Sequence, residues 1–142
     1  MAGLFARRGF NIESLAVGTT ERPDISRMTI VAEGDEQTLE QITKQLYKLI
    51  DTLKVFDLPA EKAVERELAL IRVHANEKTR TEITELVDIF KARIVDVAKD
   101  SLMIEISAEK EKVDGIQKLL EKFGIQELVR TGKIALQKGS AE

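Results

Sequence analysis

The chain of 142 residues has no cysteine, no tryptophan, one histidine and two prolines. The absence of cysteine excludes disulfides and thiolate metal sites. A single histidine, His74, leaves little from which to build a histidine metal cluster or a Ser-His-Asp triad. We therefore interpret His74 as a residue at the end of a strand.

Strong charge of one sign is also missing, since 22 Lys and Arg oppose 25 Asp and Glu for a net charge of −3. This balance gives no electrostatic reason to bind nucleic acid or an anionic membrane. The apolar runs are too short to span a bilayer, and the first residues do not resemble a secretory signal peptide. We expect a cytoplasmic protein that binds neither nucleic acid nor membrane.

A doubled pattern of secondary structure is the most informative feature that is present. Residues 64–136 read strand, helix, strand, strand, helix, strand, and residues 1–58 follow the same order from the end of the first helix onward. This order predicts an α+β protein of two ferredoxin-like (βαββαβ) units. We expect the first unit to lack its opening strand, which suggests that the sequence begins inside that domain.

The expected domains are an N-terminal unit at 1–59, a linker at 60–63, a C-terminal unit at 64–137 and a disordered tail at 138–142.

In the first unit, the pattern predicts strands at 12–19 and 27–31, joined by a turn at 20–24. Asp35 is a suitable N-cap for an amphipathic helix whose apolar positions run from 39 to 53. A short closing strand is expected at 54–58, before Pro59.

In the second unit, an apolar strand at 68–73 is expected to be central in the sheet. A capping box from Thr79 to Glu82 begins a helix, and a hairpin follows at 94–97 and 102–106. The remaining elements are a helix that ends at Gly124 and a strand at 125–136 interrupted near Gly132. The two helices are expected to turn inward Ile83, Leu86, Val87 and Phe90, and Val113, Ile116, Leu119, Leu120 and Phe123.

Two other functions of this topology find little support. RNA-recognition domains stack bases on aromatic residues of the central strands, but 27–31 and 102–106 contain none. An acylphosphatase-like enzyme needs an anion-binding loop with an arginine after the first strand, and Asn76-Glu77-Lys78 is not a convincing one. The Asp and Glu residues lie mostly on helix faces that must be solvated, which argues against acid–base catalysis.

The turn Arg8-Gly9-Phe10-Asn11-Ile12 has two interpretations. Gly9 and Asn11 suit a helix stop followed by a tight bend. The Asn11 amide has donors and an acceptor, so it also suits both ends of an amino-acid zwitterion. Composition and spacing do not separate the two.

The run from Gly3 to Leu15, Gly-Leu-Phe-Ala-Arg-Arg-Gly-Phe-Asn-Ile-Glu-Ser-Leu, closely resembles the small, regulatory subunit of acetolactate synthase (acetohydroxyacid synthase). Residues 26–31 and 40–46 resemble the same family, and Val64-Glu65-Arg66-Glu67-Leu68-Ala69-Leu70 is similar to the usual opening of its C-terminal domain. The resemblance extends over essentially the whole chain.

This resemblance implies an N-terminal ACT domain that binds valine or another branched-chain amino acid between two subunits of a homodimer. The site residue that transfers is Asn11, together with its neighbour Ile12. The family's other effector contacts lie in a loop between the first strand and first helix, to which no residue of this chain corresponds.

The resemblance also implies a non-catalytic regulatory subunit without a cofactor of its own. Its partner is the large catalytic subunit, which holds thiamine diphosphate, magnesium and FAD and performs the first shared step of branched-chain amino-acid biosynthesis. The small subunit activates that enzyme and confers feedback inhibition by valine. The alternative is a stand-alone amino-acid-sensing ACT protein that regulates a different partner.

Overall fold

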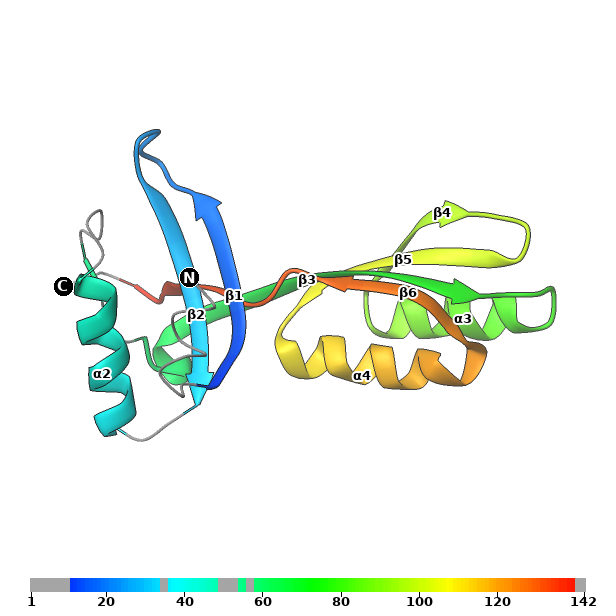
Figure 1. Cartoon of the computed structure of the whole chain (residues 1–142). Coiled ribbons are helices and arrows are strands. Elements are labelled where there is room, and N and C mark those ends of the chain that lie inside the picture. The colour runs from blue at the N-terminus through cyan, green and yellow to red at the C-terminus, as the bar shows by residue number, and fades with distance from the viewer. Residues whose placement is uncertain (1–10, 34–35, 49–53, 56–57, 140–142) are drawn as a thin grey trace. The chain divides into compact units, whose positions relative to one another are not determined.

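The computed structural model describes residues 11–33, 36–48, 54–55 and 58–139 (Figure 1). It divides into two compact units, one made of Met1–Val64 with Ala135–Glu142 and the other of Glu65–Ile134. Within the described residues the strands form a two-stranded sheet and a five-stranded sheet. The helices and antiparallel strands confirm the predicted α+β class.

The first unit contains an antiparallel hairpin of β1 (Asn11–Thr19) and β2 (Ser26–Glu33). Both predicted strands are therefore confirmed, with slightly wider bounds. Thr20 stabilises the turn, because its hydroxyl donates to the Ile25 carbonyl at 2.9 Å and accepts from the Arg22 N–H at 3.2 Å. The Ile25 N–H also donates to the Arg22 carbonyl at 3.1 Å. The turn predicted at 20–24 is thus closed by its own hydrogen bonds.

The helix α2 (Glu36–Tyr47) follows the hairpin and has the predicted amphipathic character. Ile42 is buried, while Glu40 and Lys44 are exposed. Tyr47, the last residue of the helix, contacts the chain beyond it, because its hydroxyl accepts a hydrogen bond from the Val55 N–H at 2.9 Å. The predicted N-cap Asp35 and the helical positions 49–53 lie outside the described residues.

The closing strand predicted at 54–58 is not found in the described residues. Lys54, Val55 and Leu58 belong to no strand, and residues 56–57 lie outside the described part of the chain. Within the segment predicted as a linker, 60–63, η1 (Ala60–Lys62) forms a turn of 3-10 helix and the buried Ala63 begins the next strand. The Lys138 N–H donates to the Lys62 carbonyl at 2.8 Å, so this segment is paired with a distant part of the chain.

The second unit is a ferredoxin-like sheet of β3 (Ala63–His74), β4 (Arg93–Val97), β5 (Ser101–Ala108) and β6 (Ile125–Arg130). Its strand order is β4-β5-β3-β6, and each of these neighbours is antiparallel. The first strand of the unit is therefore central, as predicted. His74 ends this strand, which confirms its structural interpretation.

The core of the second unit follows from the alternation of side chains along a strand. On β3 and β5 the buried positions pair directly across the strands, as Ala69 with Ile106, Ile71 with Ile104, and Val73 with Leu102. They pack against two helices, α3 (Thr79–Ile89) and α4 (Lys110–Leu120), that lie on one side of the sheet (Figure 1).

The helices turn inward most of the residues that the periodicity predicted. Five are buried and three are partly buried against the core: Ile83, Val87, Val113, Ile116 and Leu120, then Leu86, Phe90 and Phe123. Leu119 is the exception, because its side chain is 44 % exposed. The stripe formed by Val113, Ile116 and Leu120 leaves Leu119 at its edge.

The start of α3 differs from the predicted capping box. Asn76 performs the capping, since its side-chain oxygen accepts from the N–H groups of Lys78 at 2.9 Å and Thr79 at 3.0 Å. The Thr79 hydroxyl in turn accepts from the Asn76 N–H at 2.9 Å. Asn, like Thr, can accept hydrogen bonds from the free N–H groups at the start of a helix. The prediction that a side chain caps this helix is therefore confirmed, but the capping residue is Asn76, three residues before Thr79.

Two glycines with positive φ shape the end of the second unit. Gly124, at φ 96°, follows η2 (Glu121–Phe123) and precedes β6, so the helical segment ends where it was predicted to end. Gly132, at φ 85°, separates β6 from β7 (Ile134–Gln137), which confirms the predicted interruption. β7 then pairs with β3. Lys138, which we expected in a disordered tail, is hydrogen-bonded to Lys62.

Candidate functional site

The two predicted effector residues lie at the beginning of β1. Asn11 is opposite Glu33 in the hairpin register, and Ile12 is opposite Ala32. The Ile12 side chain is half-buried. The preceding turn residues, Arg8, Gly9 and Phe10, lie outside the described residues. The contribution of Asn11 and Ile12 to effector binding therefore stays a prediction.

A β-bulge follows immediately after these residues. The register shifts between Ile12 and Ser14, so Glu13 is an extra residue on β1. A bulge bends its strand and changes the direction of nearby side chains, and bulges are common beside functional sites. This irregularity was not evident from the sequence, because the strand formers around Glu13 continue without a break.

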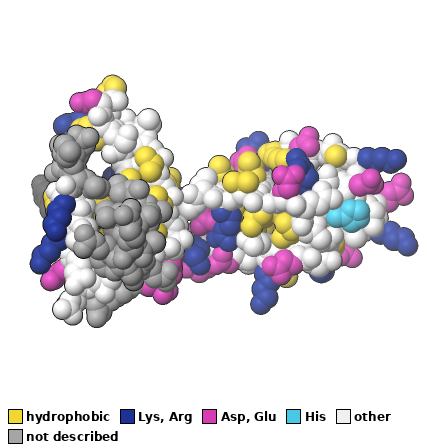
Figure 2. Space-filling view, viewed as in Figure 1, with side chains coloured by type: hydrophobic (Ala, Val, Ile, Leu, Met, Phe, Trp, Pro, Cys, Tyr) yellow, Lys and Arg dark blue, Asp and Glu magenta, His cyan; other side chains and the backbone are white. Residues whose placement is uncertain are grey.

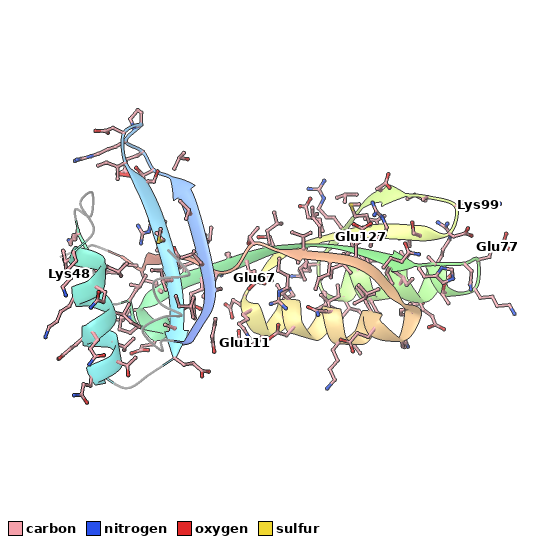
Figure 3. The ribbon with its side chains drawn as sticks, viewed as in Figure 1. Lys48, Glu67, Glu77, Lys99, Glu111 and Glu127 are labelled. Carbon is pink, nitrogen blue, oxygen red and sulfur yellow. The ribbon has the colours of Figure 1, made fainter. Side chains whose placement is uncertain are left out.

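The second unit holds a polar cluster that the sequence did not predict. Arg130, on β6, donates through Nε to the Glu67 carboxylate, and through Nη1 to Asp114 Oδ1 at 2.7 Å and Gln117 Oε1 at 2.9 Å. Asp114 also accepts from Lys110 Nζ at 3.0 Å. Glu67 is only 5 % exposed and lies where β3 passes the beginning of α4 (Figure 3). The cluster joins β3, β6 and α4.

The hydrogen bonds of this cluster stabilise the charged forms of Asp114 and Arg130. The hydrogen bond from Arg130, with that from Lys110, lowers the pKa of Asp114 below its ordinary value near 3.8. The hydrogen bond with Glu67 raises the pKa of Arg130 despite partial burial. Both shifts keep the ion pairs charged at neutral pH.

The arrangement of the cluster indicates a structural role. A general acid or base must exchange a proton with a substrate, whereas Glu67 and Asp114 each accept from a guanidinium that remains protonated. The one signal in the sequence was the position of Glu67, two residues before Ala69 on the buried face of β3. A carboxylate at a core position needs a cationic partner, but the sequence does not identify Arg130, 63 residues away.

Across 11–33, 36–48, 54–55 and 58–139, there is no group of three or more His, Asp or Glu side chains that could hold a metal ion. In these same ranges no helix has the length and apolarity required to cross a membrane.

Comparison with protein families matches the chain to two models. Residues 1–54 match the ACT domain described as AHAS small subunit-like, and residues 66–139 match the small subunit of acetolactate synthase. The second match alone covers half of the chain, so the two together account for nearly all of it.

Individual relatives agree with these matches. A probable acetolactate synthase small subunit of Archaeoglobus fulgidus is 59 % identical over 140 residues, covering 99 % of this chain and 87 % of the relative. That of Mycobacterium leprae is 48 % identical over 139 residues, covering 98 % and 82 %.

A solved structure shows the same fold. The crystal structure of the acetolactate synthase small subunit of Thermotoga maritima superposes with a TM-score of 0.89 at 44 % identity, covering 99 % of this chain and 88 % of that one. Its agreement spans both units, as does that of the sequence relatives. The chain therefore belongs to the family of acetolactate synthase small subunits.

Proposed function

We propose that this chain is the regulatory subunit of a cytoplasmic acetolactate synthase. It activates the large catalytic subunit and makes that enzyme sensitive to feedback inhibition by valine. The observation that carries the proposal is similarity over both domains, at 44–59 % identity, to proteins named as small subunits of this enzyme. Thiamine diphosphate, Mg²⁺ and FAD are assigned to the catalytic subunit, and no residue of this chain is assigned to them.

The effector site is proposed to include Asn11, with Ile12 beside it. Side-chain amides both donate and accept hydrogen bonds, which suits the carboxylate and ammonium groups of an amino acid. The bulge directly after Ile12 supports this choice, because it makes the beginning of β1 irregular where a ligand would bind. Valine is proposed to lie between the ACT domains of a homodimer, so that binding depends on the arrangement of two copies.

Regulation is proposed to work by coupled binding. If valine and the catalytic subunit prefer different arrangements of the dimer, each changes the affinity of the chain for the other. Such coupling is typically about 1–3 kcal/mol, which corresponds to about 5- to 150-fold in affinity.

The direct test measures acetolactate formation from pyruvate by the catalytic subunit, with and without this chain, across a valine titration. We expect activation by the chain and inhibition by valine. Asn11→Ala is expected to preserve activation while it weakens valine inhibition. The matched control is Ser26→Ala, which removes an exposed polar group at the opposite end of the same hairpin and should leave both properties unchanged.

Each other outcome has a definite meaning. If the chain activated the catalytic subunit equally with and without valine, the effector assignment would be contradicted, but the assignment of the catalytic subunit as the partner would be supported. Valine binding without any effect on the catalytic subunit would overturn the regulatory assignment and favour a stand-alone amino-acid sensor with a different partner.

A further inference from the structure

The two helices of the second unit present a surface on the side away from the sheet, which we call the helix face. Two contacts show how α3 and α4 lie against each other. Lys122 Nζ is 3.8 Å from Glu82 Oε2, and Gly115 approaches the Phe90 ring so closely that an added Cβ would lie 3.4 Å from it. The beginning of α3 is therefore beside the end of α4, and the two helices are antiparallel.

An apolar strip lies along the seam between these helices. Ile89 follows Glu82 by about two helical turns, and Leu119 precedes Lys122 by about one turn, so both lie on the sides of their helices that carry the ion pair. Ile89 is 71 % exposed and Leu119 is also exposed. Association would remove this strip from water, which is favourable for apolar side chains.

The charges of the helix face are separated by sign. Positions three or four apart share one side of a helix, so each helix presents its own row of charges. The row on α3 is acidic and consists of Glu82, Glu85 and Asp88. The row on α4 and η2 is mainly basic: Lys112, Lys118 and Lys122, with Glu111 as its acidic member. Figure 2 shows charged side chains of both signs projecting from this unit.

Other charges of the two helices point away from the helix face. Arg80 donates to the carbonyls of Ala98 and Lys99 at 2.6 and 2.7 Å, beside the turn that follows β4. Asp114 belongs to the cluster with Arg130 on β6. Neither reduces the separation of the two rows. Within the described part of the chain, four members of the rows form no ion pair: Glu85, Asp88, Lys112 and Lys118.

A second copy of the helix face complements the first. A two-fold axis along the seam places each α3 on the α4 of the other copy, so the acidic row faces the basic row twice. In this arrangement Glu85 of one copy faces Lys118 of the other, and the apolar strips meet on the axis. A two-fold axis across the helices places acidic row on acidic row, which like-charge repulsion disfavours.

The size of the helix face indicates a weak contact. Each helix has 11 residues and is therefore about 16 Å long. Two such helices at the usual spacing cover roughly 16 Å by 20 Å. Two faces bury about 650 Å², less than the roughly 1,200 Å² of an independently stable interface. The contact is therefore reversible and sensitive to salt, because exposed charges are screened.

We infer that the helix faces of two copies pack against each other, with each α3 on the other copy's α4, and that this contact joins homodimers into a larger reversible assembly. The contact uses neither Asn11 nor Ile12 and does not require the catalytic subunit. It goes beyond the proposed function, and each can fail while the other holds.

Sedimentation velocity of the full chain over a range of concentrations tests the contact. Low salt of about 10 mM is used, where charges interact over about 30 Å. The variants are Glu85→Lys, Lys118→Glu and the two combined in one chain. Glu61→Lys is the matched control, because it changes the net charge as Glu85→Lys does but lies on η1. Circular dichroism checks that all variants fold.

We expect the unmodified chain to form the larger assembly, and each single variant at α3 or α4 to raise its dissociation constant at least about tenfold. The combined variant should restore it to within about threefold, because exchanging the two signs keeps their attraction. Glu61→Lys should leave it unchanged.

The contact would be overturned if the combined variant associated as weakly as the single ones, or if Glu61→Lys weakened association as much as Glu85→Lys. A chain that sediments as a homodimer at every concentration would overturn the helix-face contact and leave the homodimer intact. A chain that sediments as a monomer at every concentration would overturn both.

Discussion

The described parts of the two units differ in how much apolar surface they bury. The second unit has a continuous core of buried residues that runs from Ala69 on β3 to Leu120 on α4. Among the described residues of the first unit, the buried side chains are Ile42 and Ala63, and those of hairpin residues 12–33 are half-buried or exposed. We expect the second unit to be the stable part of the chain and the first to gain stability from an effector or a second subunit.

The largest expected effect compares equivalent deletions in the two units. Ile104→Ala, at a fully buried position of β5, should lower the free energy of unfolding by about 2–5 kcal/mol. Ile30→Ala, at a half-buried position of β2, should cost about 1 kcal/mol.

Urea unfolding separates the two units, because Tyr47 in the first unit is the only tyrosine and there is no tryptophan. Tyrosine fluorescence follows the first unit, and circular dichroism follows both. If Ile104→Ala shifted the fluorescence transition as much as the circular dichroism transition, the two units would unfold together and the comparison would be wrong.

The next prediction compares two ion pairs that join the same strands on opposite faces of the sheet. Glu67→Gln breaks the buried pair with Arg130 and should destabilise the second unit by about 1.5–3 kcal/mol, the value of a hydrogen bond to a charged group, because Arg130 keeps Asp114 as a partner. Glu127→Gln breaks the more exposed pair with Arg72 and should cost less than about 1 kcal/mol. Circular dichroism in urea measures both. If the two variants lost the same free energy of unfolding, the buried cluster would not stabilise the second unit more than the exposed ion pair does.

The smallest expected effect concerns acid stability. Arg130 and Lys110 lower the pKa of Asp114 in the folded protein. The contribution of the ionised Asp114 to the free energy of unfolding is therefore fully present above the pKa of this group in the unfolded chain. That contribution is lost as the pH falls below the ordinary value near 3.8 toward the lower folded value. Asp114→Asn should therefore destabilise the chain at pH 7, and the difference from the unmodified chain should shrink as the pH falls below 3.8. The urea midpoint at each pH is the measurement, and a constant difference would contradict the assignment.

Local patterns predicted most of the secondary structure of the second unit. The hairpin of β4 and β5 and the stops at Gly124 and Gly132 follow from residues close together in sequence. The same reasoning predicted the hairpin of β1 and β2 in the first unit, and the structure confirms it. Alternation and helical periodicity are properties of short segments, so the sequence displays them directly.

Features that depend on residues far apart in the sequence were not predicted. β3 begins at Ala63 instead of 68, and β7, more than 60 residues later, pairs with it. The Glu67–Arg130 pair also joins residues that are 63 positions apart. Neither is visible in local composition. Asn11 and Ile12 were identified by resemblance alone, since an asparagine at a bend has an equally simple structural explanation.

The central claim is that effector and catalytic subunit act on one equilibrium of this chain. Its most direct test is the affinity for valine, measured by calorimetry with the chain alone and with the chain saturated by the catalytic subunit. Linkage requires the two affinities to differ by the same factor by which valine changes binding of the catalytic subunit, about 5- to 150-fold. Identical valine affinities in the two states would contradict the regulatory account.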